Sequence, residues 1–275
     1  MSEEMPREAL TQLLRWYADM GVDLAVDDIP HDRFAESQSP EKAVPPALNP
    51  PRAVAPPARV AAPAPVRITA PPPRAEDLVL EAARAETLED LRAQLLVFEG
   101  CGLKGTATQL VFSDGNPEAD VMLVGEAPGA DEDRIGRPFV GRAGQLLDKM
   151  LATIGLDRTK VYIANVVPWR PPGNRTPTPI ETGACLPFTR RQIEIVAPKI
   201  LICLGAPSMQ TLLGIKEGIM RSRGRWVDYN CGGTIIPAMA MLHPAYLLRQ
   251  PSHKKFAWQD LRELAKKLRD ASATS

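Results

Sequence analysis

The sequence predicts a three-layer α/β/α sandwich around a central, mainly parallel, four-stranded β-sheet. Short apolar runs recur from residue 121 onward, and most are followed by a segment whose apolar residues have helical spacing. Such continuous runs are typical of strands that are buried on both faces of a parallel sheet. Their alternation with helices indicates that helices cover both faces of the sheet.

The alternating part begins with the apolar run VMLV at 121–124, which predicts the first strand. A helix is expected over 141–154. The later elements are expected as a strand over 161–167, a helix over 179–195, a strand over 199–204, a helix over 206–213, strands over 225–229 and 234–241, and a C-terminal helix over 255–272. Helical crossovers between successive strands make the sheet mainly parallel.

The segment that precedes the alternating part is predicted to be partly helical. Residues 75–99 predict one or two helices. Thr87 is placed to cap the second of them, with Asp90 in the position that Glu takes in the usual capping box. Residues 104–116 predict a hairpin or a loop that turns at Asp114-Gly115.

Composition divides the chain into three regions. We expect an N-terminal amphipathic helical segment over 1–38, a Pro/Ala-rich disordered linker over 39–74 and a folded domain over 75–275. Apolar residues at helical spacing between 6 and 20 predict one helix, which either packs on the folded domain or binds another protein. The proline-rich linker favours polyproline II and cannot form a core.

Charge is distributed unevenly along a chain that carries 33 acidic and 33 basic side chains. Its first 50 residues hold ten acidic and four basic side chains, so the remainder has a net positive charge. This excess favours a polyanionic partner, although scattered solvated charge would give the same count.

The sequence contains no apolar run of the roughly 18 residues that a membrane span requires, and no signal peptide at its start. We therefore expect a soluble, cytoplasmic, monomeric protein with no membrane partner. The four cysteines are too few for a disulfide framework in so long a chain. In a reducing compartment they would be thiols or metal ligands.

One stretch, VMLVGEAPGADEDRIGRPFVGRAG at 121–144, concentrates the features of a ligand site. Its Gly/Pro-rich turn at 125–129 follows the first strand, and open α/β sheets bind ligands at the carboxyl ends of strands. Four carboxylates and one aromatic side chain follow, at Glu126, Asp131, Glu132, Asp133 and Phe139. A plain strand-to-helix connection with solvated loop acids would also explain this stretch.

This stretch closely resembles the first motif of the family 4 uracil-DNA glycosylases. Two later motifs of that family follow in order, Asn165 in VYIANVVPWRPPGNRTP and His243-Pro244 in MLHPAYLLR. The resemblance covers about residues 98 to 270. It implies a uracil-DNA glycosylase-like fold and a DNA repair hydrolase of base excision repair. Such an enzyme flips uracil out of single- or double-stranded DNA and cuts its N-glycosidic bond, leaving an abasic site.

The resemblance assigns three residues to the base pocket. Phe139 would stack on the flipped base. Asn165 would read it, because its amide offers a donor and an acceptor that suit uracil and not cytosine. His243, as a neutral imidazole, would donate a hydrogen bond to uracil O2 as charge accumulates there. Without the resemblance, these positions could also hold a core Phe, a strand-ending Asn and a structural His.

The acidic residues receive roles on the same basis. Glu132 is expected to position the attacking water, and Glu126 to form a pocket wall whose backbone contacts the base, together with Gly125 and Ala127. Ala127 stands where better-known relatives carry Asp or Asn. The turn therefore supplies no water-activating side chain at that position.

The DNA-binding residues are expected on two loops. After His243, Leu247 or Leu248 would enter the gap left by the flipped base as an apolar wedge, and Arg249 would contact a phosphate. Arg170 and Arg175 flank the rigid turn PPGN and would meet the DNA backbone.

The chain departs from the family at the iron–sulfur site. Family 4 enzymes usually hold a [4Fe–4S] cluster with four cysteines, but here only Cys101 and Cys185 occupy such positions, and Phe98 and Trp169 occupy the other two. Each iron of the cluster needs a thiolate or an equivalent ligand. We therefore expect no cofactor, with the aromatic side chains packed in its place. The alternative is that the two remaining cysteines reach the site through the fold.

The motifs contain no lysine nucleophile, so a monofunctional glycosylase is expected that leaves the DNA strand uncut. Two alternatives stay open. The chain could act mainly as a binder of uracil-containing or abasic DNA, with the N-terminal helix recruiting a repair partner. It could also be a glycosylase of the same fold that accepts other deaminated bases such as hypoxanthine or xanthine.

Overall fold

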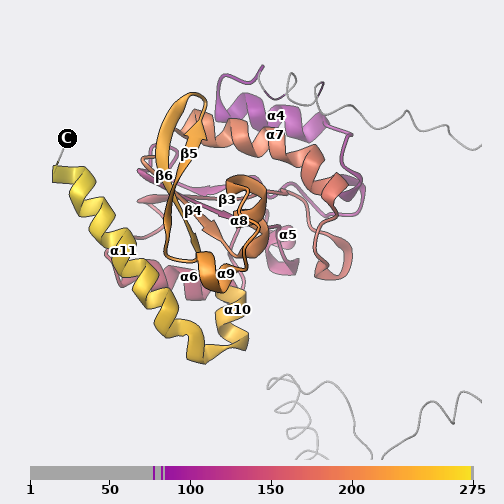
Figure 1. Ribbon diagram of the computed structural model, residues 1–275. Coiled ribbons are helices and arrows are strands. Elements are labelled where there is room, and N and C mark those ends of the chain that lie inside the picture. Colours follow the sequence, from indigo (N-terminus) through magenta and orange to yellow (C-terminus); the bar gives the residue numbers. More distant parts are fainter. Residues whose placement is uncertain (1–76, 78–81, 83, 274–275) are drawn as a thin grey trace, which may run out of the picture. The chain divides into compact units, whose positions relative to one another are not determined.

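The computed structural model describes residues 77, 82 and 84–273, which belong to one compact unit of the chain. The helix expected over 6–20 and the linker expected over 39–74 lie outside the described residues. Within these limits the fold has three layers, with a β-sheet between two layers of helices (Figure 1).

The sheet of the described part has six strands in the order β1-β3-β2-β4-β6-β5. Their bounds are Asp114–Gly115 (β1), Val121–Gly125 (β2), Val161–Asn165 (β3), Ile200–Leu204 (β4), Trp226–Cys231 (β5) and Thr234–Met241 (β6). The four central strands are parallel, as predicted. The two edge strands pair antiparallel with their neighbours and extend the expected four-stranded sheet to a mixed one.

Helices cover both faces of this sheet. Their bounds are Leu88–Val97 (α4), Ala130–Ile135 (α5), Arg142–Ala152 (α6), Pro179–Val196 (α7), Ala206–Leu213 (α8), Ile219–Ser222 (α9), Pro244–Arg249 (α10) and Lys254–Ala273 (α11). In Figure 1, α4 and α7 lie on one face of the sheet, and α6 and α11 lie on the other. The predicted α/β/α arrangement is therefore confirmed. None of the described helices has the length and apolar character that crossing a membrane requires.

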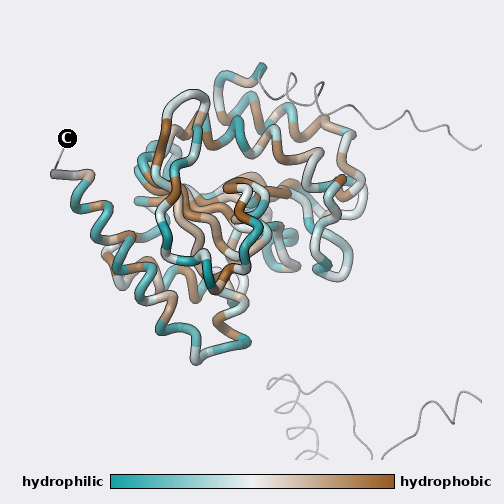
Figure 2. Tube along the Cα trace, in the orientation of Figure 1, coloured by the Kyte–Doolittle hydropathy of each residue, from teal (hydrophilic) through white to brown (hydrophobic). Residues whose placement is uncertain are grey.

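Alternate residues of each central strand enter two separate cores. In β2, Met122 and Val124 pack with the α4 and α7 layer, whereas Val121 and Leu123 pack with the α6 and α11 layer. This follows from the period of two residues with which strand side chains change face. Figure 2 shows the apolar strands in the middle of the molecule and polar outer surfaces on the helices. Burial on both faces explains why each strand is a continuous apolar run.

The sequence missed the shortest helices and misjudged one turn. α5, α9 and α10 have only four to six residues, too few for an apolar period to be recognised. Asp114-Gly115, expected to be a turn, forms the edge strand β1 beside β3, with Gly115 at φ +103°. The capping box at the start of α4 is confirmed: Asp90 N–H donates to Thr87 Oγ1 (3.1 Å) and Thr87 N–H donates to Asp90 Oδ2 (3.2 Å).

Candidate active site

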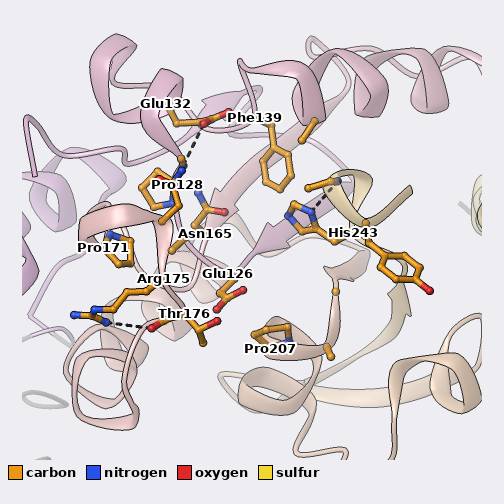
Figure 3. Close-up of a pocket in the computed structure, with 18 of the residues that line it drawn as sticks. Glu126, Pro128, Glu132, Phe139, Asn165, Pro171, Arg175, Thr176, Pro207 and His243 are labelled. Atoms are coloured by element: carbon orange, nitrogen blue, oxygen red, sulfur yellow. Dashed lines mark hydrogen bonds between the residues drawn. The ribbon is translucent and has the colours of Figure 1, made fainter. Parts of the chain in front are cut away.

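A cleft of about 590 Å³ opens at the carboxyl end of the parallel strands. Side chains from segments that follow β2, β3, β4 and β6 converge there, as Figure 3 shows. It is lined by Glu126, Ala127, Pro128, Gly129, Glu132, Phe139, Ala143, Asn165, Pro171, Asn174, Arg175, Thr176, Gly205, Ala206, Pro207, Ile219, His243, Ala245, Tyr246 and Arg249. Because parallel strands end at one edge, residues far apart in the sequence meet in this cleft.

Asn165 is the last residue of β3 and lies beside Gly125 of β2 in the sheet register. It is 4% exposed, and its Oδ1 is buried without a hydrogen-bond partner among the described residues. A Cβ on Gly125 would lie 2.4 Å from Asn165 Oδ1 and 2.7 Å from the Phe139 ring. Gly125 therefore contributes by its lack of a side chain, which lets the amide and the ring pack closely. A buried acceptor that lacks a donor is costly and points to a ligand that supplies the donor.

Phe139 lies in the loop between α5 and α6 and is buried beside the ring of His243. The two ring centroids are 5.4 Å apart, with an angle of 33° between the planes. Phe139 has φ +54°, a left-handed conformation that is unfavourable for a bulky residue. Strain of this kind is concentrated at functional sites, where the surroundings hold it in place.

His243 follows β6 and caps the N-terminus of α10. Its Nδ1 accepts a hydrogen bond from the backbone N–H of Ala245 (3.1 Å), so the proton of the neutral ring resides on Nε2. Burial, with a smaller contribution from the positive charge of Arg249, lowers the pKa of His243 to about 4. The imidazole is therefore neutral at physiological pH and has one N–H to offer.

Glu132, in α5, is held by the backbone around the cleft. Its Oε2 accepts from Gly129 N–H (3.1 Å), and its Oε1 accepts from Val140 N–H (3.0 Å) and Gly141 N–H (2.9 Å). The carboxylate thus joins the turn after β2 to the start of α6. Both of its oxygens are occupied: Oε1 holds the end of the loop that carries Phe139, and Oε2 holds the turn that precedes α5.

Glu126, by contrast, has one carboxylate oxygen that can still accept a hydrogen bond or a proton. Its Oε1 is buried and has no hydrogen-bond partner among the described residues, and the side chain lines the cleft (Figure 3). Burial raises the pKa of Glu126, and a hydrogen bond with Thr176 partly opposes that shift. A carboxylate in such surroundings is suited to accept a proton.

The expected wedge position is only partly correct. Leu247 is fully buried in the core beneath α10, so it cannot enter DNA without leaving that core; its assignment is wrong. The neighbouring Leu248 is 37% exposed and is the accessible leucine of this pair. Arg249, one residue further, lines the cleft.

The two arginines around the Pro-rich turn have partners within the chain. Arg175 donates to both carboxylate oxygens of Glu181 (2.8 and 2.6 Å) and lines the cleft. Arg170 donates to Asn174 Oδ1 (2.7 Å) and does not line the cleft. These contacts order the turn that forms one side of the opening.

The donor set around Cys101 and Cys185 does not fit a cubane cluster. The interaction between these two thiols lowers the pKa of Cys101 and raises that of Cys185, and the described part of the chain holds no group of three or more His, Cys, Asp or Glu side chains that could bind a metal. Phe98 stacks on Trp169 (centroids 6.3 Å apart) and also packs against Phe188 (4.8 Å). Buried aromatic rings, which cannot ligate iron, thus take the positions where two thiolates would be required.

The remaining cysteines do not complete the set. Cys203 is buried in β4, and Cys231, in β5, lies with its Sγ 3.5 Å from the carbonyl of Ile193. Two thiols are therefore available where a cubane needs four ligands.

The sequence missed part of the cleft wall. Gly205, Ala206 and Pro207 follow β4, and Ile219 comes from the short helix α9. The first three could have been found, because they follow a predicted strand at the carboxyl edge of the sheet. Nothing local marks Ile219, which reaches the cleft only because α9 packs against β6.

The fold and the cleft together define an α/β protein with a pocket for one planar, hydrogen-bonding ligand: an aromatic ring, a buried amide and a neutral imidazole face one space. Comparison with known families identifies it further. The profile of the uracil DNA glycosylase superfamily matches residues 112–262, more than half of the chain. The chain belongs to this superfamily.

Individual relatives agree with this membership. The Type-4 uracil-DNA glycosylase of Thermotoga maritima is 42% identical over 172 residues, 62% of this chain and 88% of the relative. That of Archaeoglobus fulgidus is 38% identical over 183 residues, 65% of this chain and 92% of the relative. The Type-5 uracil-DNA glycosylase of Thermus thermophilus is 34% identical over 114 residues, 36% of this chain and 52% of the relative.

Proposed function

We propose that this protein is a DNA repair enzyme that hydrolyses the N-glycosidic bond between uracil and deoxyribose in DNA. The observation that carries the proposal is the buried Oδ1 of Asn165, which has no partner within the described part of the chain and lies beside the ring of Phe139. Uracil presents N3–H to such an acceptor and O4 to the amide N–H₂, whereas cytosine presents the opposite pattern. Phe139 supplies the stacking surface for the flipped base.

The leaving base is stabilised by His243. As the bond between C1′ and N1 breaks, its electron pair leaves with uracil, and negative charge accumulates on O2. The neutral imidazole donates its Nε2–H to that oxygen and needs no change of protonation state, since its pKa is about 4. The Nδ1 bond to Ala245 N–H keeps the ring in this tautomer.

Water attacks the sugar with the help of Glu126. The water oxygen bonds to C1′, and its proton passes to the free oxygen of Glu126, whose pKa is raised by burial. Glu132 is then a positioning residue that holds the Phe139 loop. This reassigns the water-positioning role that the sequence suggested for Glu132, because three backbone N–H groups already occupy its oxygens.

Exchanging each glutamate for glutamine separates these two roles. We expect Glu126→Gln to lower kcat by about 10²–10⁴-fold, the usual contribution of a general base. The melting temperature should stay equal or rise, since a buried carboxylate is removed. Measuring kcat against pH should also reveal an acid limb in the wild type that lies above the ordinary pKa of glutamate and is absent from this variant.

Glu132→Gln is the matched comparison, and it should lower the melting temperature because an amide cannot accept all three backbone bonds. Its loss of activity should appear largely in KM. If Glu132→Gln instead abolished kcat with unchanged melting while Glu126→Gln kept most of the rate, the water-activating role would return to Glu132.

The reaction stops at the abasic site in this proposal. Among the described residues no lysine lines the cleft, so no amine is available to attack the sugar and promote strand cleavage. The enzyme is thus monofunctional. Arg175 and Arg249 line the cleft, and Arg170 and Leu248 are their neighbours in the sequence of the two loops. The arginines would contact the DNA backbone, and Leu248 would enter the vacated base position.

Residues 75–275 would form the catalytic domain, which acts as a monomer on single- or double-stranded DNA. The linker over 39–74 would tether the N-terminal helical segment, which would recruit a repair partner.

The chain is proposed to work without an iron–sulfur cluster. The support for this is the donor set, in which stacked Phe98 and Trp169 replace two ligands. Purified protein is expected to contain no stoichiometric iron and to show no visible absorption band. The Cys101→Ala/Cys185→Ala variant should keep uracil release within about threefold, since thiol deletion removes only a small buried volume. Stoichiometric iron that these substitutions abolish would contradict the proposal.

Release of free base from labelled oligonucleotides tests the function itself. Wild-type protein is expected to release uracil from otherwise identical strands and to leave thymine and cytosine in place. Release of hypoxanthine or xanthine at comparable rates would widen the substrate class. Tight binding of uracil-containing DNA without any release would replace the enzyme by a DNA-binding protein.

A further inference from the structure

The loop that carries Phe139 needs an external support. Phe139 adopts φ +54°, which a bulky side chain avoids, and it lies between the end of α5 and the start of α6. The carbonyl groups of Pro138 and Phe139 belong to no regular element, so donors for them must come from elsewhere in the fold.

Arg158, which precedes β3, supplies these donors. Its Nη1 donates to the carbonyl of Pro138 (3.2 Å), and its Nη2 donates to the carbonyl of Phe139. The same guanidinium is held by Asp148, through Nε (2.9 Å), and by Asp114. The Arg158 side chain is 24% exposed and that of Asp114 is 16% exposed, so this pair is largely screened from water, whereas Asp148 is 45% exposed.

The geometry of a guanidinium explains why arginine suits this place. Its planar fork presents several N–H groups in fixed directions, so one side chain can serve two adjacent carbonyls and two carboxylates at once. A lysine ammonium would keep the charge but not the fork. Asp114 belongs to the edge strand β1 and Asp148 to α6, so Arg158 ties two elements to the loop.

We propose that Arg158 is a positioning residue for catalysis: it clamps the backbone of Pro138 and Phe139 so that the Phe139 ring is held in the conformation that stacks on the flipped base. The inference rests on the proposed function and adds a residue that lies outside the cleft lining. Glu132 holds the next two residues of the loop from the other end, through Val140 and Gly141.

A substitution at Gly144 offers an independent way to displace the same loop. A Cβ at this position would lie 1.6 Å from the carbonyl oxygen of Phe139. Gly144→Ala must therefore displace the carbonyl that Arg158 binds, without touching Arg158 itself. If Arg158 positions the Phe139 loop, Gly144→Ala and substitution of Arg158 should both impair binding of the flipped base.

The decisive experiment is a double-mutant cycle between Arg158→Met and Phe139→Ala, with uracil release and melting measured for each protein. Each single substitution should lower kcat/KM by roughly 10- to 100-fold, with KM carrying most of the change, since base stacking aids binding of the flipped base. When Phe139 is already alanine, Arg158→Met should lower kcat/KM by less than about threefold, because the ring that Arg158 positions is gone. Arg158→Lys should not restore the rate, and Gly144→Ala should resemble Arg158→Met.

Arg191→Met is the matched control. Arg191 also binds a backbone carbonyl (Ala85, 2.9 Å) and a carboxylate (Glu194, 2.9 Å), but it lies on α7, outside the cleft lining. Its loss should leave kcat/KM within about threefold at temperatures below melting. Independent effects of Arg158→Met and Phe139→Ala that multiply in the double variant, or rescue by lysine, would overturn the proposal.

Amide hydrogen exchange tests the clamp without using activity. Peptides that contain residues 136–144 should exchange faster in Arg158→Met than in wild type, and Arg191→Met should leave them unchanged. If wild type released no uracil, the proposed function would fail while this measurement still decided whether Arg158 holds the loop. Unchanged exchange in Arg158→Met would overturn the clamp even in an active enzyme.

Discussion

Asn165→Asp is expected to lower kcat/KM for uracil release by roughly 10³–10⁴-fold, because sites built around buried hydrogen bonds discriminate strongly when one is lost. A carboxylate has no N–H to donate to uracil O4. It also places a negative charge beside a base that becomes negative during the reaction. Single-turnover rates on a uracil-containing oligonucleotide measure the effect, with melting temperature as the check on folding.

Asn174→Asp makes the same chemical change in the same cleft and serves as the control. Asn174 accepts a hydrogen bond from Arg170 Nε at 2.7 Å, which aspartate can still accept. Its φ of +55° is tolerated by Asp as well as by Asn. We expect activity within about threefold of wild type. Equal losses in the two variants would mean that charge in the cleft, and not base reading, explains the Asn165 result.

His243→Ala is expected to lower kcat by about 10²–10³-fold, the usual effect of removing one preorganised donor from a developing anion. His253→Gln is the control. His253 contacts the Tyr246 hydroxyl (2.7 Å) but does not line the cleft, so this change should alter the rate by less than about threefold. A His243→Ala variant with near-normal kcat would remove the imidazole from the mechanism.

The pKa of His243 also predicts the pH dependence. Since this pKa is lowered from 6.5 to about 4, the ring stays neutral above that value, and kcat should show no His243 limb at neutral pH. The folded state binds fewer protons than the unfolded state between these values. The free energy of unfolding should therefore fall as pH is lowered from 6.5 toward 4, and His243→Gln should remove that slope. Activity that falls as pH rises through 6.5 would instead indicate a catalytic imidazolium.

Sequence patterns were most informative where burial is uniform. The four central strands are apolar on both faces, so their positions were predictable from continuous runs such as 121–124 and 200–204. Because these strands are parallel, their carboxyl ends share one edge. The meeting of Phe139, Asn165 and His243 could thus be predicted from the three motifs that follow strands.

The sequence could not predict those details of the site that depend on contacts between distant segments. A six-residue helix does not reveal which of two adjacent leucines faces inward, and only packing under α10 buries Leu247 and exposes Leu248. The two glutamates look alike in the sequence. Backbone N–H groups from both ends of the α5 segment, at Gly129 and at Val140 and Gly141, occupy the two oxygens of Glu132, whereas one buried oxygen of Glu126 has no partner among the described residues.

The sequence by itself determined the layered α/β fold, the edge of the sheet at which ligands bind and the motif residues that meet there. The fold and the binding edge follow from local periodicity and from the geometry of parallel strands, whereas the motif residues were assigned by resemblance to the family 4 uracil-DNA glycosylases. Only the tertiary structure decided the tautomer of His243, the different hydrogen bonding of Glu126 and Glu132, and the contact of Arg158 with the carbonyl of Phe139. Each of these depends on desolvation or on hydrogen bonds between groups that the folded chain alone brings together.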